Sequence, residues 1–186
     1  MKKHYSVQYF VYTLVSVTAG ITLAKQVWLE KFHLQKKEKE SVERERDLFY
    51  TWFLLAQHDI SIHDFFAEQG IQTVGIMGMS RLGRRAVDSL GDRVVYAVEA
   101  ENFAAVHERL TVWRLGENPL PTADAILITD LDNVREKAEA VRREFSGRIV
   151  TLCEVLRWLL ERHGIEPRDG AIAGWPPESL IYEELG

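Results

Sequence analysis

Hydrophobic and polar positions follow three different patterns along the chain. Residues 5–24, YSVQYFVYTLVSVTAGITLA, contain no charged side chain. Residues 30–47 are dense in charge, and opposite charges stand four positions apart, which favours an exposed helix. From residue 73 onward, short apolar runs alternate with amphipathic segments. We therefore expect four parts: a hydrophobic N-terminal helix (1–29), a charged stalk with short amphipathic helices (30–70), an α/β domain (71–164) and a C-terminal tail (165–186).

The α/β part predicts five strands with helices between them. Alternating strands and helices indicate a parallel sheet with right-handed crossovers, and we expect the Rossmann-like strand order 3-2-1-4-5. Ligands of such sheets bind beyond the carboxyl ends of strands 1 and 4. The expected strands are 73–77, 93–98, 111–115, 125–129 and 148–152; the expected helices are 82–90, 103–110, 131–145 and 153–163.

A glycine turn connects the first of these strands to its helix. In a dinucleotide-binding fingerprint, the first glycine makes the turn, the second admits the pyrophosphate and the third lets helix and strand pack. Gly78 has the first place and Gly83 the third, whereas Ser80 stands at the second and its side chain would crowd a pyrophosphate. The N–H groups at the helix start still offer an anion site. The candidate cofactor-binding residues of the turn are Gly78, Met79, Ser80, Leu82 and Gly83.

Acidic residues follow the second and fourth strands. Glu99 lies 21 residues after Gly78, where an acid would accept hydrogen bonds from a ribose and favour NAD over NADP, and Glu101 is an alternative. Thr129 and Asp130 would line the same crevice. A glycine turn also occurs in such domains without any tight ligand, so a fold without a nucleotide stays open.

The uncharged N-terminal segment is long enough to span a membrane. Twenty helical residues rise about 30 Å, the thickness of a bilayer core. More Lys and Arg residues follow the segment than precede it, which predicts a single pass with the C-terminal domain in the cytoplasm. A buried strand or hairpin, a soluble core helix, and a signal peptide cleaved after Thr22-Leu23-Ala24 are alternatives.

Charge and composition restrict the kinds of ligand and partner that the chain is expected to bind. Residues 1–46 carry nine Lys and Arg against five Asp and Glu, whereas residues 47–186 carry 14 against 23. An acidic body argues against nucleic-acid binding, which needs a basic surface. The single cysteine, Cys153, excludes an intramolecular disulfide, and no histidines pair into a metal site, so we expect no metal.

An aromatic segment, DLFYTWFLLAQ (47–57), precedes the sheet. Its apolar spacing predicts a short helix that packs on the edge of the α/β domain or contacts a partner protein. Ser61 with Asp64 reads as the cap of a second helix, which ends at Gly70.

Catalytic groups are not evident. Dehydrogenases and epimerases of this general type use a tyrosine with a lysine four residues later, and none of the six tyrosines has that neighbour. No Ser/His/Asp or Cys/His grouping stands out either. We name no catalytic residue and expect a domain that is not itself an enzyme.

Residues 47–160 resemble short bacterial proteins described as NAD(P)-binding or nucleoside-diphosphate-sugar epimerase-like, from surface-polysaccharide gene sets. The stretches that carry the resemblance are LFYTWFLLAQ, ISIHDFFAEQGIQTVGIMGMSRLGRR, VVYAVEAE, ILITDLDNV and IVTLCEVL. The resemblance implies an N-terminal anchor in the bacterial inner membrane and a nucleotide site at Gly78, Gly83 and Glu99. Ser80 departs from a full glycine fingerprint.

The sequence is consistent with three candidate functions. The first is a membrane-tethered domain that recognises a nucleotide or nucleotide-sugar, accessory to polysaccharide metabolism and joined to a partner protein of glycan biosynthesis. The second is an interaction scaffold, in which segment 47–57 or the tail around Trp175 binds a partner. The third is an NAD-dependent oxidoreductase or epimerase that completes its site as an oligomer.

Overall fold

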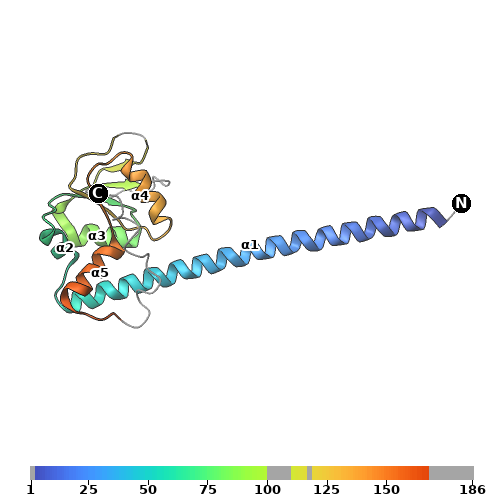
Figure 1. The fold of residues 1–186 in the computed structure, drawn as a ribbon, viewed down its shortest axis with the longest axis horizontal. Coiled ribbons are helices and arrows are strands. Elements are labelled where there is room, and N and C mark those ends of the chain that lie inside the picture. The colour runs from blue at the N-terminus through green and yellow to red at the C-terminus, as the bar shows by residue number, and fades with distance from the viewer. Residues whose placement is uncertain (1–2, 100–109, 117–118, 168–186) are drawn as a thin grey trace, which may run out of the picture. The chain divides into compact units, whose positions relative to one another are not determined.

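A computed structural model describes residues 3–99, 110–116 and 119–167, and residues 3–24 as backbone only. The chain divides into two compact units, Met1–Val42 and Glu43–Gly186. The helix α1 (Lys3–Gln57) supplies all the described structure of the first unit and enters the second (Figure 1).

The first unit exposes large apolar side chains. Trp28 is 64% exposed and Phe32 is 51% exposed, and their rings stack with centroids 5.6 Å apart. Within the residues that the structure describes, no helix is long and apolar enough to cross a membrane. The side chains of residues 5–24 lie outside the description, so the membrane span stays a prediction.

The second unit is built on a parallel sheet, as the alternating pattern predicts. Its order is β3-β2-β1-β4-β5, and each neighbouring pair runs parallel. The predicted Rossmann-like α/β fold class is confirmed. The strands are β1 (Val74–Met77), β2 (Val94–Glu99), β3 (Val112–Arg114), β4 (Ala125–Ile128) and β5 (Arg148–Thr151).

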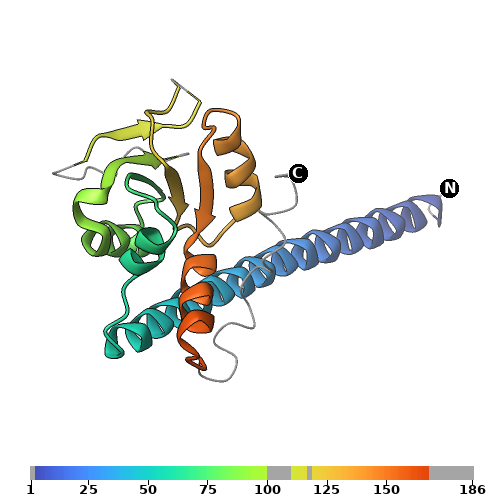
Figure 2. The same ribbon diagram turned by 60° about the vertical axis from the view of Figure 1, so that its left-hand side comes forward.

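Helices cover both faces of the sheet (Figure 2). The end of α1 packs with α2 (Ile62–Glu68), α3 (Arg81–Leu90) and α5 (Leu152–His163) in one apolar cluster, whereas α4 (Val134–Arg142) packs in the other. A short 3₁₀ turn, η1 (Gly91–Arg93), joins α3 to β2. Because the central strands β1 and β4 are fully buried, their carboxyl ends are held rigidly.

Side-chain caps fix where two helices begin. Ser61 accepts from the N–H of His63, and Asp64 accepts from the N–H of Ser61, so the predicted cap is confirmed. Thr151 and Glu154 form the same reciprocal pair at the start of α5. The Thr151 cap starts α5 directly where the chain leaves β5, whereas the Ser61 cap starts α2 before the chain enters the sheet.

Three expected elements differ from the structure or lie outside it. The charged stalk and the aromatic segment belong to one continuous α1, in which Leu48, Trp52 and Leu55 are buried against the domain. The helix expected at 131–145 is shorter, since α4 begins after Asn133, which has a left-handed backbone. The expected helix 103–110 falls almost entirely outside the described residues, as does most of the tail.

Two polar side chains lie inside the apolar clusters. Cys153 is buried, and burial raises the pKa of its thiol to about 12, which keeps it a neutral core residue. Tyr96 is also buried, and its hydroxyl has no hydrogen-bond partner among the described residues. Burial raises the pKa of Tyr96 to about 12.

Replacing Tyr96 by Phe is expected to stabilise the protein. An unpaired buried hydroxyl costs free energy of folding, so removing it should raise the free energy of unfolding by about 1 kcal/mol. Thermal denaturation of wild type and Tyr96→Phe measures this. A lower melting temperature for the variant would mean that the hydroxyl has a partner in solution.

Candidate functional site

The candidate site is the turn between β1 and α3, at the carboxyl edge of the sheet. The turn is held to both neighbouring strands: the N–H of Gly78 donates to Val98 O at 3.1 Å, and the N–H of Thr129 donates to Met77 O at 2.9 Å. Gly78 has a φ of 91°, which favours glycine. The backbone therefore places this turn at the centre of the edge where ligands of such sheets bind.

Gly83 allows α3 to start directly against the turn. A Cβ atom added at Gly83 would overlap the carbonyl oxygen of Gly78. The hydroxyl of Thr129 lies 2.6 Å from that same oxygen and 3.0 Å from Met77 O, and donates to these carbonyls. Thr129 is fully buried, so its side chain holds the turn rather than facing a ligand.

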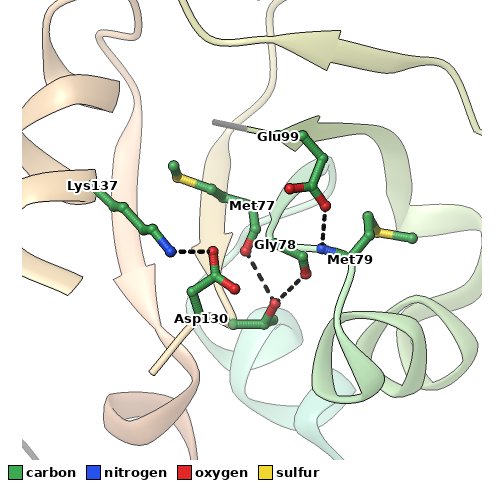
Figure 3. A network of polar contacts seen from close by, with 7 residues as sticks. Met77, Gly78, Met79, Glu99, Asp130 and Lys137 are labelled. Carbon is green, nitrogen blue, oxygen red and sulfur yellow. Dashed lines mark hydrogen bonds and ion pairs between the residues drawn. The ribbon is translucent and has the colours of Figure 1, made fainter. Parts of the chain in front are cut away.

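Glu99 reaches back to the turn from the end of β2. Its Oε1 accepts a hydrogen bond from the N–H of Met79, with an N···O distance of 2.6 Å (Figure 3). Burial raises the pKa of Glu99 above its ordinary value. The bond from Met79 and the charge of Lys137 lower this pKa, whereas the charge of Asp130 raises it further.

Asp130 lies beside the same turn and pairs with a lysine from α4. Lys137 Nζ is 2.8 Å from Asp130 Oδ2, and both side chains are about three-quarters buried (Figure 3). A Cβ atom added at Gly78 would lie 2.5 Å from Asp130 Oδ1, so the carboxylate covers the Cα of Gly78. Two carboxylates and one ammonium group thus surround the turn.

The start of α3 remains open to a ligand. Ser80 is the N-cap, yet its side chain makes no capping hydrogen bond, in contrast to Ser61 and Thr151. The first turn of α3 contains no acidic residue, and Arg81 and Arg84 are exposed. The first N–H groups of a helix have no partner within it, so they can donate to an anion.

The structure brings together most of the residues that the sequence nominated. Gly78, Met79, Ser80, Glu99 and Asp130 lie around the turn and differ in how they can act. The backbone N–H of Met79 donates to Glu99 and its side chain is buried, whereas Ser80 is exposed. Leu82 and Gly83 are buried where α3 packs, so they position the turn. Glu101, the alternative to Glu99, lies outside the described residues.

Two cationic residues near this edge were not predicted from the sequence. Lys137 lies near the start of α4, and the first turns of a helix that follows a strand lie close to the carboxyl edge of the sheet, which is a usable signal. Arg44 of α1 pairs with Asp132 at 2.9 Å, across 88 residues of sequence. No local pattern could have indicated that second pair.

The described residues around the turn supply hydrogen-bond donors and acceptors. Glu99 and Asp130 accept hydrogen bonds, whereas Ser80 and the first N–H groups of α3 donate them. The described residues contain no group of three or more His, Cys, Asp or Glu side chains that could hold a metal ion. This chemistry suits recognition of a ligand with both hydroxyl groups and an anionic group.

Comparisons with known proteins found no match: neither a family model, nor a curated protein, nor a solved structure matches the chain. The resemblance to epimerase-like proteins therefore stays a prediction.

Replacing Gly83 by Ala is expected to disrupt the turn. The new Cβ would overlap a backbone oxygen that cannot move without shifting β1, so we expect a loss of roughly 3 kcal/mol or more in unfolding free energy. Chemical denaturation measures the loss.

Gly91 at the other end of α3 provides the control. Its φ is also positive, but the space around it is open, so Gly91→Ala should cost about 1 kcal/mol. Equal losses for the two variants would contradict the contact described for Gly83.

Proposed function

We propose that the α/β domain recognises a nucleotide or nucleotide-sugar at the β1–α3 turn. The observation that carries the proposal is the open start of α3 beside Glu99. Ser80 is exposed and makes no cap, the first helical N–H groups are available, and a carboxylate lies within reach of the same turn. A phosphate would accept from the helix start, and Glu99 would accept from ribose hydroxyl groups. NAD and nucleoside-diphosphate sugars both carry these groups.

The proposed role is accessory rather than catalytic. A recognition domain needs donors and acceptors in fixed positions, which this turn supplies, but it needs no acid/base pair. The link to polysaccharide metabolism, and to a partner protein of glycan biosynthesis, rests on the resemblance of residues 47–160 to epimerase-like proteins.

Nucleotides are expected to stabilise the full-length protein against heat. A ligand present at a hundred times its Kd adds about 2.7 kcal/mol to the unfolding free energy. Differential scanning fluorimetry with millimolar NAD, ADP and UDP-glucose measures the shift. The proposal fails if none of these compounds raises the melting temperature.

Two serines at opposite ends of α3 test where such a ligand binds. Ser80→Ala should weaken binding about fivefold, because one hydroxyl hydrogen bond is lost, without lowering the stability of the free protein, since Ser80 makes no cap. Ser89→Ala is the matched control and should leave the affinity unchanged. Equal effects of both substitutions would place the ligand elsewhere.

We further propose that residues 5–24 tether the domain to the bacterial inner membrane as a single pass, with the domain in the cytoplasm. The absence of charge over twenty residues and the basic residues that follow them support this proposal. The exposed Trp28 and Phe32 add apolar and aromatic surface next to the segment, where interfacial side chains are favoured.

Membrane fractionation tests the tether. Leu14→Arg with Val17→Arg places two charges inside the segment and should move the protein out of the membrane pellet, because each buried charge costs about 3 kcal/mol. Gln35→Arg with Val42→Arg adds the same charge at exposed positions and should leave the protein in the pellet. A wild-type protein that stays in the supernatant would contradict the tether.

A further inference from the structure

Glu99 accepts a hydrogen bond from the backbone N–H of Met79, and a phosphate bound on the turn would use the same N–H group. The N–H of Met79 is the first after Gly78, and it faces the carboxylate at 2.6 Å. Hydrogen bonds between an ionised acceptor and a backbone N–H are short and strong, as this one is. A diphosphate placed over the turn would compete with Glu99 for this donor.

Glu99 differs from Asp64 and Glu154, the two carboxylates that form capping boxes at helix starts. Asp64 and Glu154 belong to their own helices and cap them from three residues away. Glu99 comes from a neighbouring strand, 20 residues after Met79, and bonds to the residue before the N-cap of α3. It therefore places a negative charge on the turn without serving as a helix cap.

The surrounding charges increase this effect. Asp130 covers Gly78 from the loop after β4, and Lys137 is the cation that pairs with it in Figure 3. Beside Met79, a diphosphate would meet two carboxylates and the ammonium group of Lys137, whereas the arginines of the first turn of α3, Arg81 and Arg84, are exposed to solvent. Like charges at such distances repel one another, most strongly where the groups are partly buried.

We propose that Glu99 is an internal anion that determines which ligands the turn admits. A ligand that offers only hydroxyl or amino donors can donate to the second carboxylate oxygen of Glu99 while the bond from Met79 to Oε1 remains. A ligand that places a phosphate on the turn must displace the carboxylate first. This inference rests on the proposed function, because it names the ligand class that the same turn accepts.

If Glu99 only held a ribose, removing its carboxylate would change the ligand affinities in the opposite direction. In that case, removing the carboxylate would weaken every nucleoside-containing ligand and would leave inorganic pyrophosphate unaffected. If Glu99 is an internal anion, its removal strengthens the binding of pyrophosphate. Inorganic pyrophosphate therefore separates the two roles, because it has no ribose.

Isothermal titration of the full-length protein with inorganic pyrophosphate at pH 7.5 tests the proposal. Glu99→Ala should bind about tenfold more tightly than wild type, since one opposing charge and one competing acceptor are removed. Glu99→Gln should lie between them, because its amide oxygen still accepts from Met79 but carries no charge. An affinity of Glu99→Ala equal to or weaker than that of wild type would overturn the proposal.

Two controls exclude a general charge effect. Asp88→Ala removes one exposed negative charge from the far part of α3 and should change the pyrophosphate affinity less than twofold. Adenosine carries no phosphate, and its affinity should not rise in Glu99→Ala. A similar gain for Asp88→Ala, or for adenosine, would also overturn the proposal.

The pH dependence of the wild-type protein gives a second readout that needs no variant to fold. Burial raises the pKa of Glu99, so it takes up a proton at a higher pH than an ordinary glutamate. The charges that act on it are those of Asp130 and Lys137, and Arg114 stands at the paired position of β3. Pyrophosphate affinity should rise from pH 7.5 to pH 5.5 more in wild type than in Glu99→Ala. Identical profiles would contradict the inference.

The two proposals fail separately. If no nucleotide stabilises wild type, the proposed function is wrong, but tighter pyrophosphate binding by Glu99→Ala would still support the internal anion. If nucleotides stabilise wild type and Glu99→Ala gains nothing, the turn binds nucleotides and Glu99 does not select among them.

Discussion

The close approach between Gly83 and the carbonyl of Gly78 is the constraint on which the rest of the site depends. It lets α3 begin immediately after β1, and it brings the buried hydroxyl of Thr129 onto the same oxygen. With the helix start fixed there, the N–H of Met79 lies within reach of β2, and the Cα of Gly78 lies under the loop after β4. The polar network is therefore a result of backbone packing.

Stabilisation of the turn by the protein's own carboxylates and binding of an anionic ligand there oppose each other. The positive end of α3 attracts negative charge, and the chain itself supplies some of it through Glu99 and Asp130. Each carboxylate that interacts favourably with the positive end of α3 also reduces the positive potential that could attract an anionic ligand. In the proposed role of Glu99, ligand affinity would depend on how easily the carboxylate leaves Met79, and the pairing of Lys137 with Asp130 would reduce the repulsion of an anionic ligand.

The sequence predicted the sheet because its signals are local. Apolar runs of four to six residues, bounded by glycines such as Gly78 and Gly147, indicate the strands, and their alternation with helical segments predicts the parallel order. It also placed Glu99 at the correct edge, because the end of a strand fixes a side chain to within a few ångströms. It could not show that Glu99 would turn onto Met79, since that depends on side-chain torsions and on neighbours distant in sequence.

The sequence does contain an indication that α1 is one continuous helix. Residues 5–57 contain no proline and a single glycine, Gly20, so nothing in them interrupts a helix. The changes from apolar to charged to aromatic composition alter the environment of the helix but not its backbone. The pair between Arg44 and Asp132 was beyond prediction for a different reason: it joins two elements whose proximity only the complete fold creates.

The single cysteine has a practical consequence. Cys153 is buried and its thiol stays protonated at neutral pH, so thiol-directed reagents will react with it slowly in the folded protein. A cysteine introduced at an exposed position, such as Arg84 on α3, would then be the preferred site for a spin label or a fluorophore. Two such cysteines, one on either side of the turn, would allow a spectroscopic distance between two labels to be measured without removing Cys153.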